Sequence, residues 1–428
     1  MRESGERNGS FTLVVCGIGQ LATLHSVILG PRKGPEMSLI GLMRGQAVAI
    51  HNGIIVQVAD EKDVLDDHRL QSTTQILDVG GRLVTPGLID AHTHFIFAGQ
   101  RADEFEEKIR GVSYLEIAAR GGGIKRTVRD TTATSANDLI KLGRQRLDRY
   151  LEMGVTTVEV KSGYGLSLEH ELRMLKIAQT LNEIHPVDVV STLLAAHEIP
   201  EKMSKEEYLR LVVDTIIPRV AELNLADFCD VFCERGVFSI EESELILNKG
   251  LEYGLVPKIH ADQIHNTGAS RLGVKVGAVS VDHADHIDQA GIQQLAESNT
   301  VAVLLPGCNF FMGLDSRAPA RSMIDQGVAV ALATDFNPGS CMTQNIQLIM
   351  TMGCVQFRMT PAEVLTAVTT NAAHAIGRAH DRGRIQCGFQ ADMTVFDVND
   401  IRELVYHFGA LHTWKTIKHG LVCWERTQ

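Results

Sequence analysis

Two histidines separated by one residue, His92 and His94, are the first group in this sequence with a recognisable chemistry. They end the run Gly87-Leu88-Ile89-Asp90-Ala91-His92-Thr93-His94, which follows the hydrophobic segment 82–86, read here as a strand entering a turn. In a strand, residues i and i+2 point to the same face, so both imidazoles would project together from one strand end. Such a pair can chelate a single divalent metal. Chance pairs are common in a chain with 17 histidines, so the hypothesis needs further ligands.

Other side chains suited to metal binding or acid–base chemistry follow further apolar segments. Lys161 and Tyr164 follow the second segment, and later segments end at His197, Glu234, His260, His283 and Asp335. In a parallel barrel the active site collects at the carboxyl ends of the strands, so these side chains would meet there. Two imidazoles from a first strand, one from a fifth (His260) and a carboxylate from an eighth (Asp335) form a mixed nitrogen and oxygen set. This set suits Zn²⁺, and Fe²⁺ is an alternative.

A metal held in this way predicts a hydrolytic reaction. The cation lowers the pKa of a bound water towards neutrality and so generates hydroxide. His283 is left to act as a base or to hold the hydroxide, since imidazole titrates near neutral pH. Asp335 could accept the proton of the water and pass it to a leaving nitrogen. The constellation therefore predicts metal-assisted hydrolysis of a C–N bond.

The segments that must position these residues alternate between strand-like and helix-like patterns. After the first strand, apolar, β-branched runs recur at 156–161, 189–195, 228–232, 255–260, 278–283, 300–305 and 328–334. Helical patterns lie between them, for example at 171–181 and 208–217, where Pro218 is expected to end or kink the helix. The capping box Thr360-Pro361-Ala362-Glu363 opens another helix towards Ile376. About eight strands over about 300 residues favour an α/β fold with a (β/α)8 barrel of the TIM type. The period alone leaves a doubly wound sheet open.

Both ends of the chain are rich in short β segments. Asn52-Gly53 joins the apolar runs 47–51 and 54–58 and suits the type I′ turn of a hairpin. Residues 392–397 and 416–424 have the same character. We therefore expect a small β domain built from both termini, residues 1–85 and 385–428, around a barrel of residues 86–384.

Composition restricts the class of protein. With 428 residues, 22% of them charged and 44% hydrophobic, the chain is ordinary for a soluble globular protein with a large core. The net charge of −11 and the pI near 5.9 argue against a nucleic-acid-binding surface. No apolar stretch approaches the roughly 20 residues of a membrane helix, and residues 1–10 lack the apolar core of a secretion signal. We expect a cytoplasmic protein with a small-molecule substrate and no nucleic-acid or membrane partner. A homodimer is expected only as the commonest default.

Eight cysteines are scattered without a Cys-x-x-Cys pair, which indicates reduced thiols. Cys229 and Cys233 are four residues apart, which invites a metal-binding interpretation. Both lie in the strand-like run 228–238, where residues i and i+4 share a face but stand well apart. We therefore expect them to pack in the core.

Several motifs together resemble the amidohydrolase superfamily. They are Pro-Gly-Leu-Ile-Asp-Ala-His-Thr-His, the histidine of the fifth strand and Thr334-Asp335 of the eighth. The resemblance implies a metal-bearing barrel beside a small β-sandwich. Within the superfamily the chain is similar to the imidazolonepropionase family, which opens 4-imidazolone-5-propanoate to N-formimidoyl-L-glutamate in histidine degradation. The matching segments span most of the barrel and are 98–101, 161–166, 195–197, 258–262 and 335–339.

The resemblance also implies a role for individual residues. One divalent metal, Zn or Fe, would be held by His92, His94, His260 and Asp335. His283 would be catalytic. The substrate would be held by Arg101, Tyr164 and His197, with contributions from Asn337, Gly339 and Ser340 of the last loop.

Arg101 is the residue that the chemistry of this substrate singles out. A guanidinium binds a carboxylate through two parallel hydrogen bonds, and the substrate carries a propionate. Taken without the resemblance, a surface salt bridge with Asp103 or Glu104 is the simpler interpretation. Tyr164, between two glycines, is equally open to a packing role.

Two features depart from the family pattern. Three residues past the strand-five histidine the family often has a glutamate, where this chain has Gln263, whose amide cannot act as a general acid or base. We therefore assign the proton transfers to His283 and Asp335 and an orienting role to Gln263. Relatives with two metals bridge them with a carboxylated lysine or a glutamate, typically from strand four. Glu234 is the polar candidate there and Lys161 belongs to strand two, so we expect a single metal.

Alternatives stay open at three points. The run Gly121-Gly122-Gly123-Ile124 could cover a ligand or merely turn the chain, and it lacks the Gly-Lys-Ser/Thr ending of a phosphate loop. A deaminase of a heterocyclic base would use the same metal ligands, but an uncharged base offers no carboxylate to Arg101. A catalytically silent relative that serves as a scaffold would be expected to lose ligands, and this chain keeps the whole set.

Overall fold

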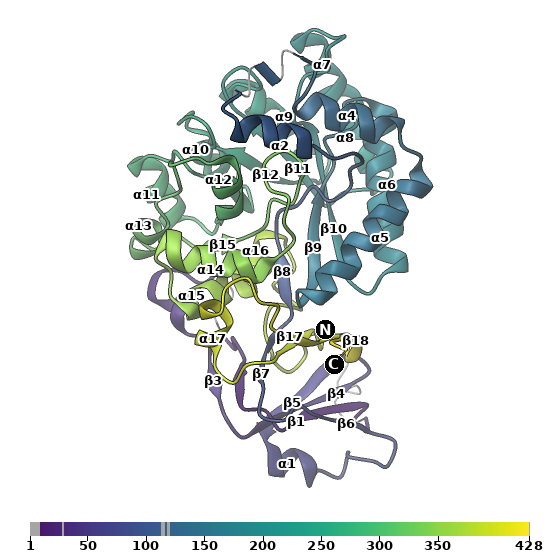
Figure 1. Cartoon of the computed structure of the whole chain (residues 1–428), viewed down its shortest axis with the longest axis vertical. Helices are drawn as coiled ribbons and strands as arrows, with labels where there is room; N and C mark the ends of the chain where they lie inside the picture. Colours follow the sequence, from purple (N-terminus) through teal and green to yellow (C-terminus); the bar gives the residue numbers. More distant parts are fainter. Residues whose placement is uncertain (1–8, 28–29, 113–115, 118–119, 428) are drawn as a thin grey trace.

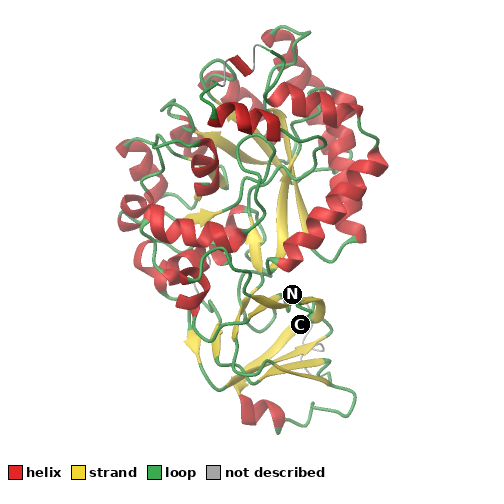
Figure 2. Cartoon of the chain, in the orientation of Figure 1, coloured by secondary structure: helices red, strands yellow, loops and turns green. Residues whose placement is uncertain are grey.

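The computed structural model describes residues 9–27, 30–112, 116–117 and 120–427. It has a large body in which helices surround strands, and a smaller part made mainly of strands (Figures 1 and 2). Segments from the first 90 residues and from the last 40 lie together in the smaller part (Figure 1). No described helix combines the length and the apolar character needed to cross a membrane.

The large body is built on eight parallel strands, each paired with the next along the chain. They are β8 (Leu88–Asp90), β9 (Val155–Lys161), β10 (Asp188–Ala196), β11 (Phe228–Cys233), β12 (Val256–Ala261), β13 (Ser280–His283), β14 (Val301–Leu304) and β15 (Val330–Leu332). The first and last strands meet just beyond their ends, where Thr93 and Phe336 form a parallel bridge and the Asp335 N–H donates to the His92 carbonyl. All eight expected strands are present, and the (β/α)8 barrel is confirmed.

Helices follow most of the strands, and most of these helices cover the outside of the barrel (Figure 2). They are α2 (Ala102–Ile109), α4 (Ile124–Ala133), α5 (Ala136–Glu152), α6 (Leu168–Ile184), α7 (Lys205–Leu211), α8 (Ile217–Glu222), α9 (Ile240–Glu252), α10 (Ala269–Lys275), α11 (Gln289–Glu297), α12 (Pro306–Met312), α13 (Ala320–Asp325), α14 (Ile346–Phe357), α15 (Pro361–Ala367) and α16 (Thr370–Ala375).

Two helix predictions need correction in detail. Pro218 neither ends the helix nor breaks it, because a π-helical turn, η3 (Val212–Ile216), joins α7 to α8 and places the proline in the first turn of α8. The π-helical turn directly before it lets the helical run continue through a residue that has no N–H to donate. The capping box at Thr360 is present, but the helix that it opens stops at Ala367 and resumes as α16.

The smaller part contains two sheets that draw strands from both ends of the chain. One has the order β5-β4-β1-β6 and the other β18-β17-β16-β7-β2-β3. The strands are β1 (Leu13–Cys16), β2 (Gln20–Ala22), β3 (Leu42–Met43), β4 (Gln46–His51), β5 (Ile54–Asp60), β6 (Gln75–Asp78), β7 (Leu83–Pro86), β16 (Met393–Phe396), β17 (Thr413–Lys418) and β18 (Leu421–Glu425). Three short helices belong to the terminal segments. The helix α1 (Glu61–Leu65) packs on β4 and β5, whereas η2 (Gly34–Ser38) and α17 (Ile401–Tyr406) pack against barrel helices α13 to α15. The predicted hairpin is confirmed, with φ of 47° at Asn52 and 81° at Gly53, as a type I′ turn requires.

The strand expected to lead into His92 is in fact two strands. Residues Leu83–Pro86 form β7, which pairs antiparallel with β16 in the smaller part, whereas β8 begins at Leu88 in the barrel. Gly87 lies between them, and a Cβ atom there would lie 2.3 Å from Oγ1 of Thr156. The absence of a side chain at Gly87 therefore lets the chain pass from one sheet directly into the other.

Candidate metal centre and active site

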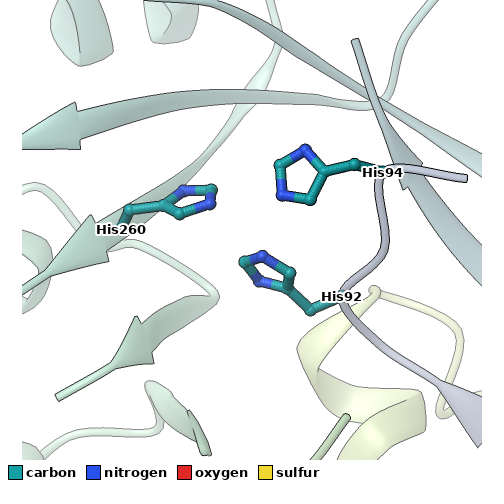
Figure 3. A group of neighbouring side chains, drawn as sticks. All are labelled: His92, His94 and His260. Atoms are coloured by element: carbon teal, nitrogen blue, oxygen red, sulfur yellow. The ribbon is translucent and has the colours of Figure 1, made fainter. Parts of the chain in front are cut away.

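Three histidines converge inside the carboxyl end of the barrel. His92 and His94 follow β8, His260 lies on β12, and one ring nitrogen from each lies within 4.8 Å of the others. Figure 3 shows the three imidazoles pointing towards one another. Nε2 of His92 and Nε2 of His260 are buried without a hydrogen-bond partner among the described residues. Buried polar atoms are normally paired, so unpaired ring nitrogens facing a common point fit a divalent cation.

Asp335 lies beside this group, on the loop after β15, whose end meets the end of β8. Its Oδ1 is 3.5 Å from Nε2 of His92 and 3.5 Å from Nε2 of His94. Asn337 donates to Oδ1 over 2.9 Å and the Ser340 hydroxyl donates to Oδ2 over 2.9 Å. Burial raises the pKa of Asp335 to about 6, and a cation at the centre of the rings would lower it by stabilising the carboxylate.

Burial favours the neutral form of four imidazoles around the site. Burial lowers the pKa of His92, His94 and His283 well below the ordinary value, and lowers that of His197 to about 3. A neutral imidazole keeps a lone pair on one ring nitrogen, which is what a metal ligand or a base needs. His283 ends β13 with a φ of 77°, and its Nδ1 lies 3.9 Å from Oδ2 of Asp285.

A layer of buried charges lies beneath the histidines. Oδ2 of Asp282 is 2.6 Å from Nδ1 of His92, and Oδ2 of Asp230 is 3.1 Å from Nδ1 of His260. A carboxylate on one ring nitrogen fixes the tautomer and turns the other nitrogen towards a metal. The Asp282 carboxylate therefore orients the ring of His92, and Asp230 places a negative charge beside the ring of His260.

Lys161 joins the two carboxylates. Its Nζ lies 2.8 Å from Oδ2 of Asp230, 2.8 Å from Oε1 of Glu159 and 3.3 Å from Oδ2 of Asp282, and none of these side chains is exposed. Burial alone would lower the pKa of Lys161, but the three carboxylates outweigh it and raise that pKa above its ordinary value. The ammonium is thus a fixed positive charge under the site.

Sequence reasoning missed Glu159, Asp230 and Asp282. The signal was present, because each is a charged residue inside an otherwise apolar strand run, and a buried charge is costly unless it is paired. Which partner each one meets depends on the closure of the barrel, which the sequence does not display.

A pocket opens above the histidines and gathers the predicted substrate and catalytic residues. The predicted residues that line it are His94, Arg101, Tyr164, His197, His260, Gln263, His283, Asp335, Asn337, Gly339 and Ser340. Ile124, Glu198, Phe232, Ile264 and Met312 complete the wall. His92 is absent from the wall because it is fully buried below it. The structure brings the residues together, while their individual roles stay predictions.

Arg101 and Tyr164, each of which had a structural alternative to substrate binding, show features of both roles. Arg101 lines the pocket, yet its Nε donates to Oε2 of Glu104 over 2.7 Å, so the predicted salt bridge exists but is buried rather than on the surface. Tyr164 is 3% exposed and lines the pocket beside His94 and His197, whose rings stack at 5.1 Å. Burial raises the pKa of Tyr164, which keeps the phenol protonated.

The remaining metal candidates are engaged elsewhere. Glu234 accepts hydrogen bonds from the N–H groups of Ile264 and His265 at 3.0 and 3.2 Å. Cys229 and Cys233 are buried in the core as expected, and burial raises the pKa of both thiols. Protonated thiols and a carboxylate occupied by backbone donors are poor metal ligands.

Comparisons with known proteins agree with this geometry. A model of the amidohydrolase family matches residues 241–422. A curated protein named imidazolonepropionase from Geobacillus sp. (strain WCH70) is 46% identical over 413 residues, 96% of this chain and 97% of the relative. Another of that name, from Brevibacillus brevis (strain 47 / JCM 6285 / NBRC 100599), is 47% identical over 406 residues, 94% of this chain and 96% of the relative.

Solved structures share the fold at lower identity. An adenosine deaminase from Xanthomonas campestris with bound zinc has a TM-score of 0.71 at 17% identity, covering 97% of this chain and 93% of that one. An atrazine chlorohydrolase from Arthrobacter aurescens TC1 complexed with zinc has a TM-score of 0.70 at 16% identity, covering 96% and 95%. At these identities the likeness shows the fold alone.

Proposed function

The chain belongs to the imidazolonepropionase family of amidohydrolases, and on that premise we propose how its residues carry out the reaction. The enzyme hydrolyses the cyclic C–N amide bond of 4-imidazolone-5-propanoate and yields N-formimidoyl-L-glutamate, a step of histidine degradation. Like other amidohydrolases it is metal-dependent, and the group of His92, His94 and His260 could bind the metal.

In this proposal one divalent cation, Zn or Fe, is held by His92, His94, His260 and Asp335. The observation that carries it is the convergence of buried, unpaired ring nitrogens within 4.8 Å of one another, with a carboxylate oxygen 3.5 Å away. When bound, such a cation supplies Lewis acidity and makes hydroxide available near neutral pH. The ion pairs of Lys161 support a single metal, because an ammonium enclosed by carboxylates is not free to become a carboxylated bridge.

The proton transfers fall to His283 and Asp335. Hydrolysis adds water across the C–N bond, so one proton must leave the attacking oxygen and one must reach the departing ring nitrogen. Burial favours a neutral His283, which can accept a proton, and the Asp335 carboxylate beside the histidines would take a proton from the water and pass it to the leaving nitrogen. Gln263 lines the pocket and, as an amide, orients the substrate without exchanging a proton.

The substrate is held by residues around the pocket rim. Arg101 binds the propionate through charge-assisted hydrogen bonds, while Tyr164 and His197 contact the ring. The last loop adds Asn337, Gly339 and Ser340. Its backbone is fixed because Oδ1 of Asn337 accepts hydrogen bonds from the N–H groups of Gly339 and Ser340 at 2.8 and 2.9 Å.

We also propose the domain limits and the surroundings of the enzyme. Residues 1–85 and 385–428 would form the small β domain and residues 86–384 the barrel. We expect the enzyme to act in the cytoplasm, and its net charge of −11 argues against a nucleic-acid partner. A homodimer is the default assembly.

The decisive experiment follows the ultraviolet decay of imidazolone propionate, generated in situ from urocanate by urocanase, with and without the purified protein. We expect faster decay, with N-formimidoyl-glutamate as product, and loss of both the acceleration and the bound metal in His260→Ala. A metal-loaded wild-type protein that leaves the decay unchanged would transfer the assignment to a deaminase of a heterocyclic base. Metal analysis of the purified protein should give one divalent cation per chain, and two would contradict the single-metal proposal.

A further inference from the structure

Glu104 is a buried acid on the helix that follows Arg101. It is 5% exposed, and its Oε2 accepts the hydrogen bond from Nε of Arg101 over 2.7 Å. Its two carboxylate oxygens also lie 3.2 Å from the N–H of Gly123, and Oε1 lies 3.5 Å from Nη1 of Arg126. A buried carboxylate is costly unless it is paired and hydrogen-bonded. The arrangement is thus a built contact and not a chance pairing at the surface.

The contact with Glu104 leaves the outer edge of the Arg101 guanidinium free. In the described part of the chain, the bond from Nε is the sole hydrogen bond of this side chain, so the terminal amino groups keep their donors for a ligand. Gly339 confines them from the opposite side, because a Cβ there would lie 2.5 Å from Nη1 of Arg101. The guanidinium is held between a carboxylate and a bare stretch of backbone, and it faces the pocket.

The same carboxylate reaches the glycine-rich loop. Gly123, with φ of 73° and ψ of −152°, precedes α4, and the next residue, Ile124, is part of the pocket wall. A Cβ at Gly122 would lie 3.0 Å from Oε1 of Glu104, so the loop packs directly on the acid. Glu104 therefore links Arg101 to an apolar residue on the wall of the pocket.

Helix α2, which carries Glu104, is also tied to the last barrel loop. Nζ of Lys108 donates to the Gly339 carbonyl over 3.2 Å, and Phe105 stacks on Phe311 of α12 with ring centroids 4.9 Å apart. Figure 1 shows α2 lying across the end of the barrel. The helix thus has contacts on both sides of the pocket that would hold Glu104 in place.

We propose that Glu104 is a positioning residue for substrate recognition. By occupying Nε it turns the two terminal amino groups of Arg101 towards the carboxylate of the substrate, and by holding Gly123 it sets Ile124 against the same pocket. The inference rests on the proposed function, in which Arg101 binds that carboxylate. It assigns to the pocket small heterocyclic acids whose carboxylate sits on a short chain.

The test separates recognition of the carboxylate from the integrity of the pocket. Binding of imidazole-4-propionate and of 4-ethylimidazole, which lacks the carboxylate, is measured by calorimetry on the metal-loaded wild type, Glu104→Ala and Glu104→Gln. We expect Glu104→Ala to weaken the binding of imidazole propionate by about tenfold, which is about 1.4 kcal/mol, and the binding of ethylimidazole by less than about twofold. Glu104→Gln keeps an acceptor for Nε of Arg101, so its affinity for imidazole propionate should lie between those of the wild type and Glu104→Ala. In steady-state assays KM for imidazolone propionate should rise with little change in kcat, since Glu104 does not touch the reacting bond.

A matched control lies one residue away. Asp103 is on the same helix with its side chain 67% exposed, and it binds Arg126 at 2.7 Å but not Arg101. Asp103→Ala removes the same charge from the same helix and should leave both affinities unchanged.

Three results would overturn the inference. The first is an equal loss of both probes in Glu104→Ala, which would indicate a collapsed pocket. The second is a strong loss of affinity for imidazole propionate in Arg101→Ala, while neither Glu104→Ala nor Glu104→Gln changes that affinity. The third is an Asp103→Ala effect as large as that of Glu104→Ala. Because calorimetry needs no turnover, a wild type that fails to hydrolyse imidazolone propionate would refute the proposed function while the role of Glu104 is still tested by binding.

Discussion

Oδ2 of Asp282 lies 2.6 Å from Nδ1 of His92, and neither side chain is exposed to solvent. The two residues are 190 positions apart in the sequence and meet only because the closed barrel brings β8 and β13, which are not neighbours in the sheet, to the same interior. The contact leaves Nε2 of His92 as the free nitrogen, directed at the point where the other two histidines converge. The orientation of a metal ligand is therefore set by a residue on another strand.

Asp282→Asn tests this orientation. The asparagine amide has the same shape as the aspartate carboxylate, but it has no negative charge. Its NH2 group is a donor and cannot accept a hydrogen bond from Nδ1 of His92. We expect metal affinity to fall by about 10- to 100-fold, the usual effect of removing such a partner. Competition with a chelator measures the affinity, and Asp325→Asn, at a side chain 63% exposed, is the control. Unchanged affinity would show that packing alone holds the ring.

Lys161→Met should destabilise the fold as well as the site. The substitution keeps most of the side-chain volume but removes the nearest cation from the buried Glu159, Asp230 and Asp282, and leaves Lys258 3.5 Å from Glu159. Loss of one partner from a buried charge group costs about 3 kcal/mol or more. Denaturant titration measures the free energy of unfolding. As a control, Lys249→Met breaks a pair with Glu252 at the surface and should change the free energy of unfolding by less than about 1 kcal/mol. Equal effects of the two variants would argue against the central role of Lys161.

Gly339→Ala should weaken substrate binding without loss of the metal. The added methyl group would lie 2.5 Å from Nη1 of Arg101 and must displace the guanidinium. Misplacing one charged hydrogen bond predicts a KM raised by about tenfold, with the metal content unchanged. Gly30→Ala is the matched control, because a Cβ there would meet nothing closer than an Asn299 oxygen at 3.6 Å. A normal KM in Gly339→Ala would mean that Arg101 is free to move.

Stability should fall in mild acid through His374, a residue of α16 remote from the metal. Burial, followed by the nearby Arg384, lowers the pKa of His374 to about 4 from an ordinary value of 6.5. The unfolded chain therefore binds more protons than the folded one between these values. The contribution of His374 to the free energy of unfolding is therefore complete above pH 6.5 and is lost as the pH falls towards 4.

The His374→Gln variant removes the titrating group and isolates this contribution. Melting temperatures measured across that pH range should fall less steeply in the variant than in the wild type. His68→Gln, at a side chain 92% exposed, should keep the wild-type slope. Parallel slopes for wild type and His374→Gln would exclude His374 as a source of acid sensitivity.

The sequence predicted the barrel well because its signals are local. Apolar runs closed by polar residues place His260, His283 and Asp335 at strand ends, and Asn52-Gly53 marks its hairpin by a turn that few other pairs adopt. Local patterns could not separate β7 from β8, since two apolar strands joined through Gly87 read as one continuous run.

The contacts that orient the site residues were beyond reach for a different reason. Asp230 and His260 come from neighbouring strands, and Glu104 and Gly123 lie 19 residues apart around a turn of the chain. Each pairing depends on side-chain directions after the barrel closes, and the sequence carries only the hint of a charge where an apolar residue is expected.

The direct passage from β7 into β8 makes the barrel a poor candidate for excision as an independent module. β7 is paired with β16, from the last 40 residues, and Lys418 of β17 is bonded to Asp188 at the start of β10. A chain cut before β16 would leave β7, which ends six residues before His92, without that neighbour. Ribosomal synthesis reaches β16 only after the whole barrel has been made, so the anchoring of the first metal ligands must be completed by the last segment to emerge.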